Sequence, residues 1–236
     1  MESLKLDLGT YQSAYESALA DLDEHKVVQR IWGLDHTVWQ DSPVEIDNRL
    51  GWLTIMDTML QDVDRMKMLA SALENEGYTN VLLIGMGGSS LAPEVFSFVF
   101  DESYGLGLNI LDSTDPSMVK NYAKILDLNT TAFIVATKSG GTAETLSGFK
   151  YFYNLLSDLY DGDKEAIGKH FIGITDPESK LIGMGERYQF RALFINDPNI
   201  GGRYSVLSYF GLVPASLIGG DVPELLRRAQ EMGHNN

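Results

Sequence analysis

The sequence predicts an α/β protein, a three-layer α/β/α sandwich built on a five-stranded parallel sheet and preceded by a helical segment. Two observations lead to this prediction. From Asn80 onward, short apolar runs are each followed by Gly, Ser, Thr or Asp and then by a helical pattern. Most of these runs are apolar on both faces, which is typical of parallel strands that helices cover from both sides.

The first part of the chain shows a helical pattern. Between residues 12 and 61 the pattern is interrupted, notably at Pro43 and Gly51. From Trp52 to Leu73 apolar residues recur at helical spacing, and we expect the tryptophans and methionines of this region to pack in the interior. We therefore divide the chain into an N-terminal helical segment, residues 1–77, that packs on an α/β domain, residues 78–236.

The expected strands are five apolar runs. They are residues 81–85, 108–112, 132–137, 171–175 and 191–196. Because ligands of such sheets bind outside the carboxyl ends of the strands, the segments that follow these runs are the candidate sites.

Composition excludes several classes of partner. The formal charge of the 236-residue chain is -15, with 18 basic and 33 acidic side chains, so nucleic acid and anionic membranes are poor candidates. The chain has no cysteine, no start resembling a signal peptide and no apolar stretch of the ~18 residues that cross a membrane. We expect a cytoplasmic protein that has no metal site and needs no cofactor.

The segment after the first run, GMGGSSLAPEV, has three interpretations. Gly85 and Gly87 have the spacing of a dinucleotide-binding loop, and Asp112 ends the next run, where a ribose-binding acid would lie. Ser90, however, occupies the third glycine position of that motif. A sugar or phosphate site at the start of the following helix, and a purely structural turn, remain open alternatives.

The segment after the third run, TKSGGTAET, extends from Thr137 to Thr145 and carries four hydroxyls. Its adjacent glycines, Gly140 and Gly141, allow successive N–H groups to converge on an anion, and Ser139 adds a hydroxyl beside a helix that starts near residue 142. Phosphate matches such a set of donors. Ordinary capping of the helix is the alternative interpretation.

A third segment, NDPNIGGRYSVLSYFGLVPASLIG, places Arg203 after Gly201 and Gly202, at the expected start of an apolar helix. An arginine is electrostatically unfavourable at a helix N-terminus, so its position suggests an anionic partner. A surface ion pair with Asp197 is the alternative.

Together these segments resemble the glucose-6-phosphate isomerase family, within the wider group of sugar isomerase (SIS) domains, which have a flavodoxin-like fold. The glycine–glycine–arginine segment is the most specific of them. DSTDP from Asp112 and ITDPESKL from Ile174 fit the same layout, and NRLGW from Asn48 resembles the form fused to transaldolase in some bacteria. The resemblance covers nearly the whole chain, but only the amino-terminal half of such an isomerase.

The resemblance implies roles for particular residues. Arg203 matches the arginine that stabilises the negative enediol(ate) intermediate. Thr137 stands where serine is common, and Gly140 and Gly141 replace bulkier residues of many relatives. The residues expected to bind the substrate and its phosphate are Gly88, Ser89, Thr137, Lys138, Ser139, Gly140 and Thr142.

The family's catalytic glutamate and histidine, and a lysine near its carboxyl terminus, have no counterpart here. We expect His25, His36, His170 and His234 to be structural or solvated, and Glu144 to support its helix start. A base and a ring-opening acid are both required for aldose–ketose isomerisation. We therefore expect the chain to be a fragment, or one domain of a longer enzyme, that binds sugar phosphates weakly without isomerising them at an enzyme-like rate.

Two hypotheses follow. The chain is the amino-terminal half of an isomerase that interconverts glucose 6-phosphate and fructose 6-phosphate, or it is a stand-alone regulatory module that binds sugar phosphates without chemistry. A dinucleotide-dependent oxidoreductase is a third, weaker alternative. By resemblance alone, we expect a homodimer.

Overall fold

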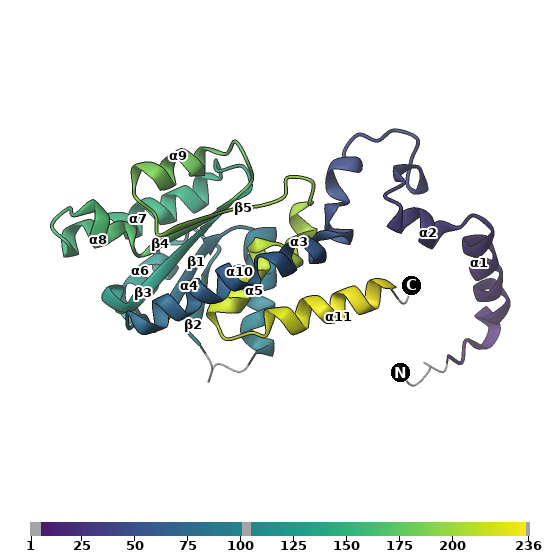
Figure 1. Ribbon diagram of the computed structural model, residues 1–236, viewed down its shortest axis with the longest axis horizontal. Coiled ribbons are helices and arrows are strands. Elements are labelled where there is room, and N and C mark those ends of the chain that lie inside the picture. Colours follow the sequence, from purple (N-terminus) through teal and green to yellow (C-terminus); the bar gives the residue numbers. More distant parts are fainter. Residues whose placement is uncertain (1–5, 101–104, 235–236) are drawn as a thin grey trace.

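The computed structural model describes residues 6–100 and 105–234. Its centre is a five-stranded sheet, and every neighbouring pair of strands is parallel. The strand order is β2-β1-β3-β4-β5, so β1 lies between β2 and β3 (Figure 1). The strands are β1 (Asn80–Gly85), β2 (Gly107–Leu111), β3 (Thr131–Ala136), β4 (Phe171–Thr175) and β5 (Ala192–Ile195). All the expected strands are confirmed, and so is the parallel α/β fold.

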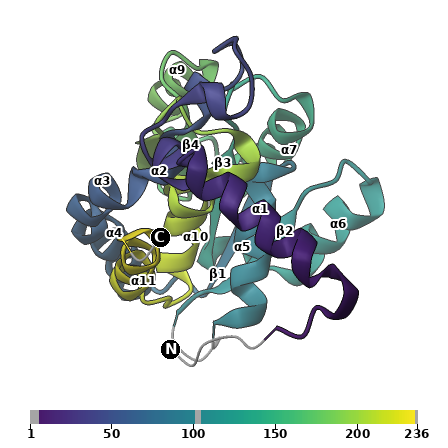
Figure 2. The same cartoon turned by 90° about the vertical axis from the view of Figure 1, so that its right-hand side faces the viewer.

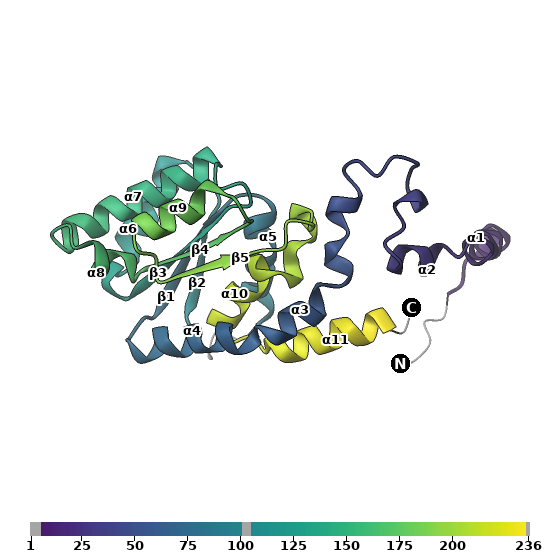
Figure 3. The ribbon, with the colours of Figure 1, turned by 45° about the horizontal axis from the view of Figure 1, so that its top comes forward.

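One face of the sheet is covered by four helices that follow β2, β3 and β4 in the chain (Figure 3). These are α6 (Pro116–Ile125), α7 (Ala143–Leu159), α8 (Lys164–Gly168) and α9 (Lys180–Arg187). Aromatic side chains dominate this interior: Phe133 and Phe171 of the sheet lie 5.2 Å apart between ring centroids, and Phe149 and Phe152 of α7 pack against them. Burying rings of this size supplies much of the hydrophobic stabilisation on this face.

The opposite face is covered by helices from both ends of the chain and by the helix that follows β1. They are α3 (Ile55–Gln61), α4 (Val63–Asn75), α5 (Gly88–Val99), α10 (Tyr209–Leu217) and α11 (Val222–His234). Every residue of α10 is buried. With helices on both faces, the predicted three-layer architecture is confirmed. The regular pattern from residue 52 to residue 73 is not one helix, because the backbone turns between α3 and α4 at Asp62, with φ of -109°.

The helices nearest the amino terminus have a different environment. Helices α1 (Gln12–Glu24) and α2 (Val27–Trp32) contain no buried residue. They extend away from the α/β body in Figure 1, so α1 lies in front of it in Figure 2. Trp39, which follows them, is 49% exposed, and Met68 of α4 is 66% exposed, so the expectation that the tryptophans and methionines of the helical segment are interior is wrong for these two residues. Packing of the N-terminal segment on the sheet is therefore made by α3 and α4, and the division at residue 78 stays a prediction.

Short 3-10 helices connect several of these elements. They are η1 (Gly9–Tyr11), η2 (His36–Val38), η3 (Asp47–Arg49), η4 (Gly51–Leu53), η5 (Leu128–Thr130) and η6 (Gly202–Leu207). Across residues 6–100 and 105–234, the helices are all too short or too polar to cross a membrane.

Candidate functional site

The strand order creates a crevice at the carboxyl edge of the sheet. Neighbouring strands β1 and β3 continue into α5 and α7, which lie on opposite faces of the sheet. The loops therefore diverge where these two strands end, and such a topological switch point is the usual position of a ligand in an open parallel sheet. Two of the three segments that the sequence singled out meet here, the loops after β1 and β3.

A cavity of about 220 Å³ lies between these loops. Six of the seven residues predicted to bind substrate line it: Gly88, Ser89, Thr137, Lys138, Ser139 and Thr142. Met86, Ala136, Gly202 and Ser205 complete the lining. The fold thus brings together segments more than a hundred residues apart in the sequence, and the resulting cavity is lined largely by hydroxyl and backbone groups.

The loop after β3 presents hydroxyls that the helix itself does not use. Thr142 is the N-cap residue of α7, yet its side chain makes no capping hydrogen bond. Its Oγ1 instead lies 3.0 Å from Oγ1 of Thr137, and the Oγ atom of Ser139 accepts from the N–H of Gly141 at 3.2 Å. Ordinary capping therefore does not account for this cluster. Thr137, Ser139 and Thr142 all line the cavity at the N-terminal end of α7, where the helix dipole favours an anion.

Gly140 differs from the other predicted residues because it is buried and does not line the cavity. Its φ of +65° is in the left-handed region. A Cβ atom at this position would lie 2.6 Å from the backbone nitrogen of Leu181 and 2.7 Å from Oγ of Ser179. Gly140 therefore shapes the loop and lets it pack on the start of α9, so the structure gives it a conformational role at a distance from the ligand position.

The loop after β1 lies very close to the glycine–glycine–arginine segment. Gly87 has φ of +56°, and a Cβ atom on Gly88 would lie only 2.1 Å from the carbonyl oxygen of Gly202. Ser205 joins the two segments, because its hydroxyl donates to the carbonyls of Gly202 at 2.8 Å and Gly88 at 3.2 Å. Ser90 is buried, with its hydroxyl bonded to the carbonyl of Gly87 at 3.1 Å. A side chain thus fills the place that the dinucleotide interpretation requires to be glycine, which weakens that interpretation.

Arg203 lies in η6 and not at the start of α10, where the sequence placed it. It is exposed and lines a second cavity of about 210 Å³, which shares Gly88, Gly202 and Ser205 with the first. The expected alternative, an ion pair with Asp197, does not form: that carboxylate accepts from the N–H of Asn199 at 2.8 Å. Arg203 has no hydrogen bond or ion pair within the described part of the chain. Its guanidinium is free to meet an anion next to the hydroxyl cavity.

Lys138 is held at the edge of the cavity by groups that the sequence did not single out. Its Nζ lies 3.0 Å from Oδ2 of Asp176 and donates to the carbonyl of Ile200. Burial raises the pKa of the Asp176 carboxyl, although the neighbouring ammonium of Lys138 acts in the opposite direction. Asp176 immediately follows β4, so the rule that sites lie at the carboxyl ends of strands could have identified it. Ser205 was also missed, since nothing in its local sequence marks it.

None of the histidines whose side chains the structure describes lines this cavity. His170 is buried before β4, and its two ring nitrogens lie 2.9 Å from the carbonyl of Thr131 and 3.0 Å from the hydroxyl of Tyr160. His25 and His36 lie in the N-terminal segment, and the side chain of His234 is outside the described part. Where the structure is described, neither histidine nor glutamate lines the cavity, and no three His, Asp or Glu side chains gather in a metal-binding group.

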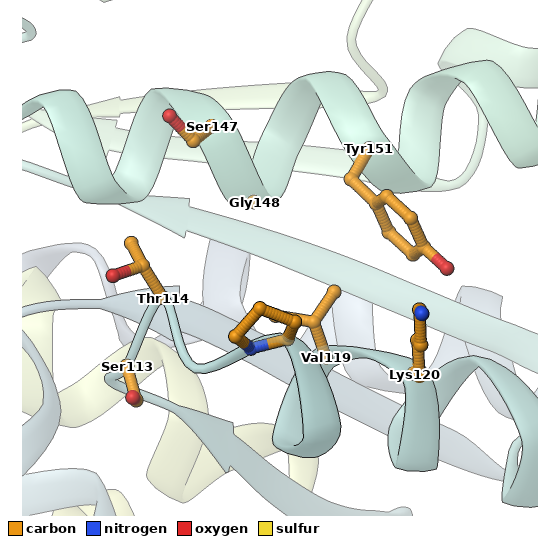
Figure 4. Close-up of a pocket in the computed structure, with 8 residues that line it drawn as sticks. Ser113, Thr114, Val119, Lys120, Ser147, Gly148 and Tyr151 are labelled. Carbon is orange, nitrogen blue, oxygen red and sulfur yellow. The ribbon is translucent and has the colours of Figure 1, made fainter.

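A further cavity of about 230 Å³ lies between α6 and α7 (Figure 4). Pro116 and Val119 form its apolar wall, and Lys120 and Tyr151 stand at one end. None of the predicted site residues lines it. Its lining includes Ser113, Thr114 and Ser147, but it lies between two helices and not at the switch point between β1 and β3, so we take the cavity at the switch point as the candidate site.

The fold and the site together define a doubly wound α/β protein with a donor-lined cavity at its topological switch point. Comparison with known proteins identifies the family. The phosphoglucose isomerase family matches residues 45–235, which is most of the chain. The chain therefore belongs to the phosphoglucose isomerase family.

Individual relatives agree with this assignment. A glucose-6-phosphate isomerase of Prochlorococcus marinus (strain NATL2A) is 30% identical over 232 residues, covering 94% of this chain and 41% of that protein. One from Campylobacter jejuni is 33% identical over 183 residues, covering 77% of this chain and 43% of that protein. A crystal structure of a hypothetical protein from Thermus thermophilus has a TM-score of 0.81 at 27% identity, covering 98% of this chain and 52% of that one. The chain thus spans less than half the length of these two isomerases.

Proposed function

We propose that this chain binds the phosphate of a sugar phosphate in the cavity between β1 and β3. We further propose that it is the amino-terminal half of a glucose-6-phosphate isomerase, which interconverts glucose 6-phosphate and fructose 6-phosphate through an enediol(ate). The observation that supports this best is the convergence of Ser139, Thr137 and Thr142 at the start of α7, with no capping bond from Thr142. Family membership supports the same chemistry.

Phosphate is the anion that this set of donors fits. Its charge of roughly -1.5 to -2 and its acceptor oxygens suit hydroxyls and helix N–H groups held in a small cavity. Hydrogen bonds to a charged group contribute about 1.5–3 kcal/mol each, before the cost of association is subtracted. Three or four of them can hold a phosphate ester despite the chain's formal charge of -15.

Arg203 supplies the second part of the proposal. It lies beside the phosphate cavity, across the shared residues Gly88 and Gly202, without a partner of its own in the described structure. A positive charge beside the cavity can stabilise an enediolate that develops at the far end of a sugar held by its phosphate. We assign to Arg203 this electrostatic role.

Proton transfer is the part that the cavity does not supply. Isomerisation moves a proton between adjacent carbons, which needs a base close to the substrate. Within the described structure no glutamate or histidine lines the cavity. We therefore propose that the base and the ring-opening acid come from outside this span, and that the chain by itself binds without turning over.

Calorimetric titration of the purified chain tests the phosphate site. We expect glucose 6-phosphate to bind with a dissociation constant on the order of 1 mM, which corresponds to about -4 kcal/mol. Glucose, which lacks the phosphate, is the control and should show no binding. Equal binding of the two sugars would contradict a phosphate site.

A dehydrogenase-coupled assay that starts from fructose 6-phosphate tests the missing base. We expect no turnover above background. Turnover in the ordinary enzymatic range of about 1–10³ per second would show that a base is present after all.

A regulatory module that binds sugar phosphates without chemistry is the second candidate. The same absence of a base from the described cavity lining favours it. The two candidates differ in Arg203, because a pure binding module has no enediolate to stabilise. Adding a separately produced carboxyl-terminal half of a relative to this chain distinguishes them: recovery of isomerase activity that depends on Arg203 supports the enzyme. The homodimer stays a prediction.

A further inference from the structure

The ammonium of Lys138 connects two loops that otherwise meet only across the cavity. Lys138 follows β3, whereas Ile200, whose carbonyl accepts from Nζ of Lys138, directly precedes the Gly201-Gly202-Arg203 segment. The same ammonium lies 3.0 Å from Oδ2 of Asp176, at the end of β4. One lysine thus links the ends of two strands to the segment that carries the arginine.

The backbone around this lysine is also fixed from the β4 side. The N–H of Asp176 donates to the carbonyl of Lys138 at 3.2 Å. The hydroxyl of Thr175 donates to the carbonyl of Thr137 at 2.7 Å and lies 3.2 Å from that of Lys138. The loop that carries Asp176 is therefore bonded to the loop that carries Lys138 through the main chain, so the carboxylate has a defined place relative to the phosphate cavity.

The lysine side chain would otherwise have considerable freedom. It has several rotatable bonds and a compact charge, and 26% of the side chain is exposed, so fixed hydrogen-bond partners for the ammonium restrict its motion. The Asp176 side chain is only 15% exposed and belongs to a turn whose backbone is bonded to the carbonyl of Lys138. An ammonium has three N–H donors. Asp176 and Ile200 use two of them, which leaves one for a ligand in the cavity that Lys138 lines.

We propose that Asp176 is a positioning residue for phosphate binding: it holds the Lys138 ammonium at the rim of the cavity and, through Lys138, keeps the Gly201-Gly202-Arg203 segment in register with the phosphate loop. The inference rests on the proposed function, since it assumes that the cavity binds a sugar phosphate. Asp176 itself does not line the cavity. It acts on the ligand only through Lys138.

The expected effect of losing Asp176 follows from the freedom that Lys138 regains. Immobilising a long side chain on binding costs about 0.5–1.5 kcal/mol, which corresponds to a twofold to tenfold weaker affinity. Removing a carboxylate also lowers the negative potential near an anion, which by itself would strengthen binding. The two effects have opposite signs. A weaker affinity for the sugar phosphate indicates that Asp176 positions Lys138, whereas a stronger affinity indicates only the loss of a negative charge.

The test compares Asp176→Asn with Glu178→Gln by titrating each protein with glucose 6-phosphate. Glu178 is an exposed acid two residues further along the same turn, so its substitution removes the same charge without touching Lys138. We expect Asp176→Asn to weaken binding about fivefold, within the range above, and Glu178→Gln to leave it unchanged or slightly stronger. In a Lys138→Met background, Asp176→Asn should have no further effect, because a residue that acts through Lys138 has nothing left to position.

The second measurement observes the lysine directly by ¹H–¹⁵N NMR. An ammonium held by an ion pair and a carbonyl exchanges its protons slowly enough to be seen at mildly acid pH, so the folded wild-type protein should show this signal for Lys138. The signal should be lost in Asp176→Asn and kept in Glu178→Gln. This measurement needs no ligand. The wild-type spectrum is informative even if the variants do not fold.

Each outcome discriminates between the proposals. If wild-type protein binds glucose 6-phosphate but Asp176→Asn binds it as Glu178→Gln does, the positioning role is wrong and the phosphate site stands. If the wild-type protein binds no sugar phosphate, the proposed function fails and this inference fails with it. Absence of an ordered Lys138 signal in the folded wild-type protein overturns the positioning role even if Asp176→Asn does not fold.

Discussion

The close approach of the β1 loop to the glycine–glycine–arginine segment can be tested by the substitution Gly88→Ala, which adds a single methyl group. A Cβ atom on Gly88 would lie 2.1 Å from the carbonyl oxygen of Gly202, whereas ordinary contact begins at 3.4 Å. The obstacle is backbone, which cannot rotate away as a flexible side chain can. Gly88→Ala therefore requires the two segments to separate by roughly 1 Å, and such overpacking costs about 1–3 kcal/mol.

The expected change in melting temperature follows from this range. For chains of this size, 1 kcal/mol shifts the melting temperature by about 2–4 °C, so Gly88→Ala should lower it by about 2–12 °C. Binding should also weaken, because the bond from the Ser205 hydroxyl to the carbonyl of Gly88 joins the two sides of the cavity. Circular dichroism during heating measures the first effect, and titration with glucose 6-phosphate measures the second.

Gly183→Ala is the matched control. Gly183 also lies in a helix, but a Cβ atom there has no atom within 4 Å. Alanine should stabilise the helix at this position by about 0.5–1 kcal/mol, since glycine is the weaker helix former. If Gly88→Ala proves as stable as Gly183→Ala and binds as the wild-type protein does, the two segments are not in the close contact described here.

Two further predictions concern a buried histidine and a hydroxyl of the cavity. Burial lowers the pKa of His170 below its unfolded value of about 6.5, so the unfolded state takes up a proton first as the pH falls. The free energy of unfolding, measured with urea, should therefore be insensitive to this residue above pH 6.5 and decrease below pH 6.5 until the pKa of His170 in the folded state is passed. His170→Gln should remove that part of the decrease. An identical pH profile in the variant would contradict this prediction. Thr142→Val removes a hydroxyl but keeps the side-chain shape, so it should weaken glucose 6-phosphate binding about tenfold or more, the value of one hydrogen bond to a charged group. Thr142 makes no capping bond, so the substitution removes only its bond to the Thr137 hydroxyl, which costs about 1 kcal/mol and lowers the melting temperature by about 2–4 °C. An unchanged affinity would exclude this hydroxyl from the site.

The strands and the loops of the site were accessible from sequence because their signals are local. Each strand is a short apolar run, and the runs that form β1, β3 and β4 are buried in one sheet as predicted. The hydroxyls of the loop from Thr137 to Thr142 are close together in the chain, and they match the phosphate-binding motif of the family that the sequence resembles. Six of the seven residues predicted to bind substrate accordingly line one cavity.

The differences between the predictions and the structure have physical causes that no local sequence pattern reveals. Gly140 has the same local signal as its neighbours, but its left-handed backbone conformation and its contact with Leu181 place it behind the cavity. The turn at Asp62 divides a continuous apolar pattern into two helices that pack on different partners, α3 on α11 and α4 on α10. Arg203 precedes its helix by a 3-10 turn, since the segment closes on Gly88 before α10 begins.

The sequence by itself determined the class of fold, the five strands and the loops that carry the chemistry, because apolar periodicity, glycine and hydroxyl clusters act over a few residues. Only the tertiary structure decided which of those loops face one another, how closely Gly88 approaches Gly202, and that Asp176 and Ile200 hold Lys138. These contacts join residues that are tens of positions apart or more. They depend on the order of strands in the sheet, which brings the end of β3 between the ends of β1 and β4.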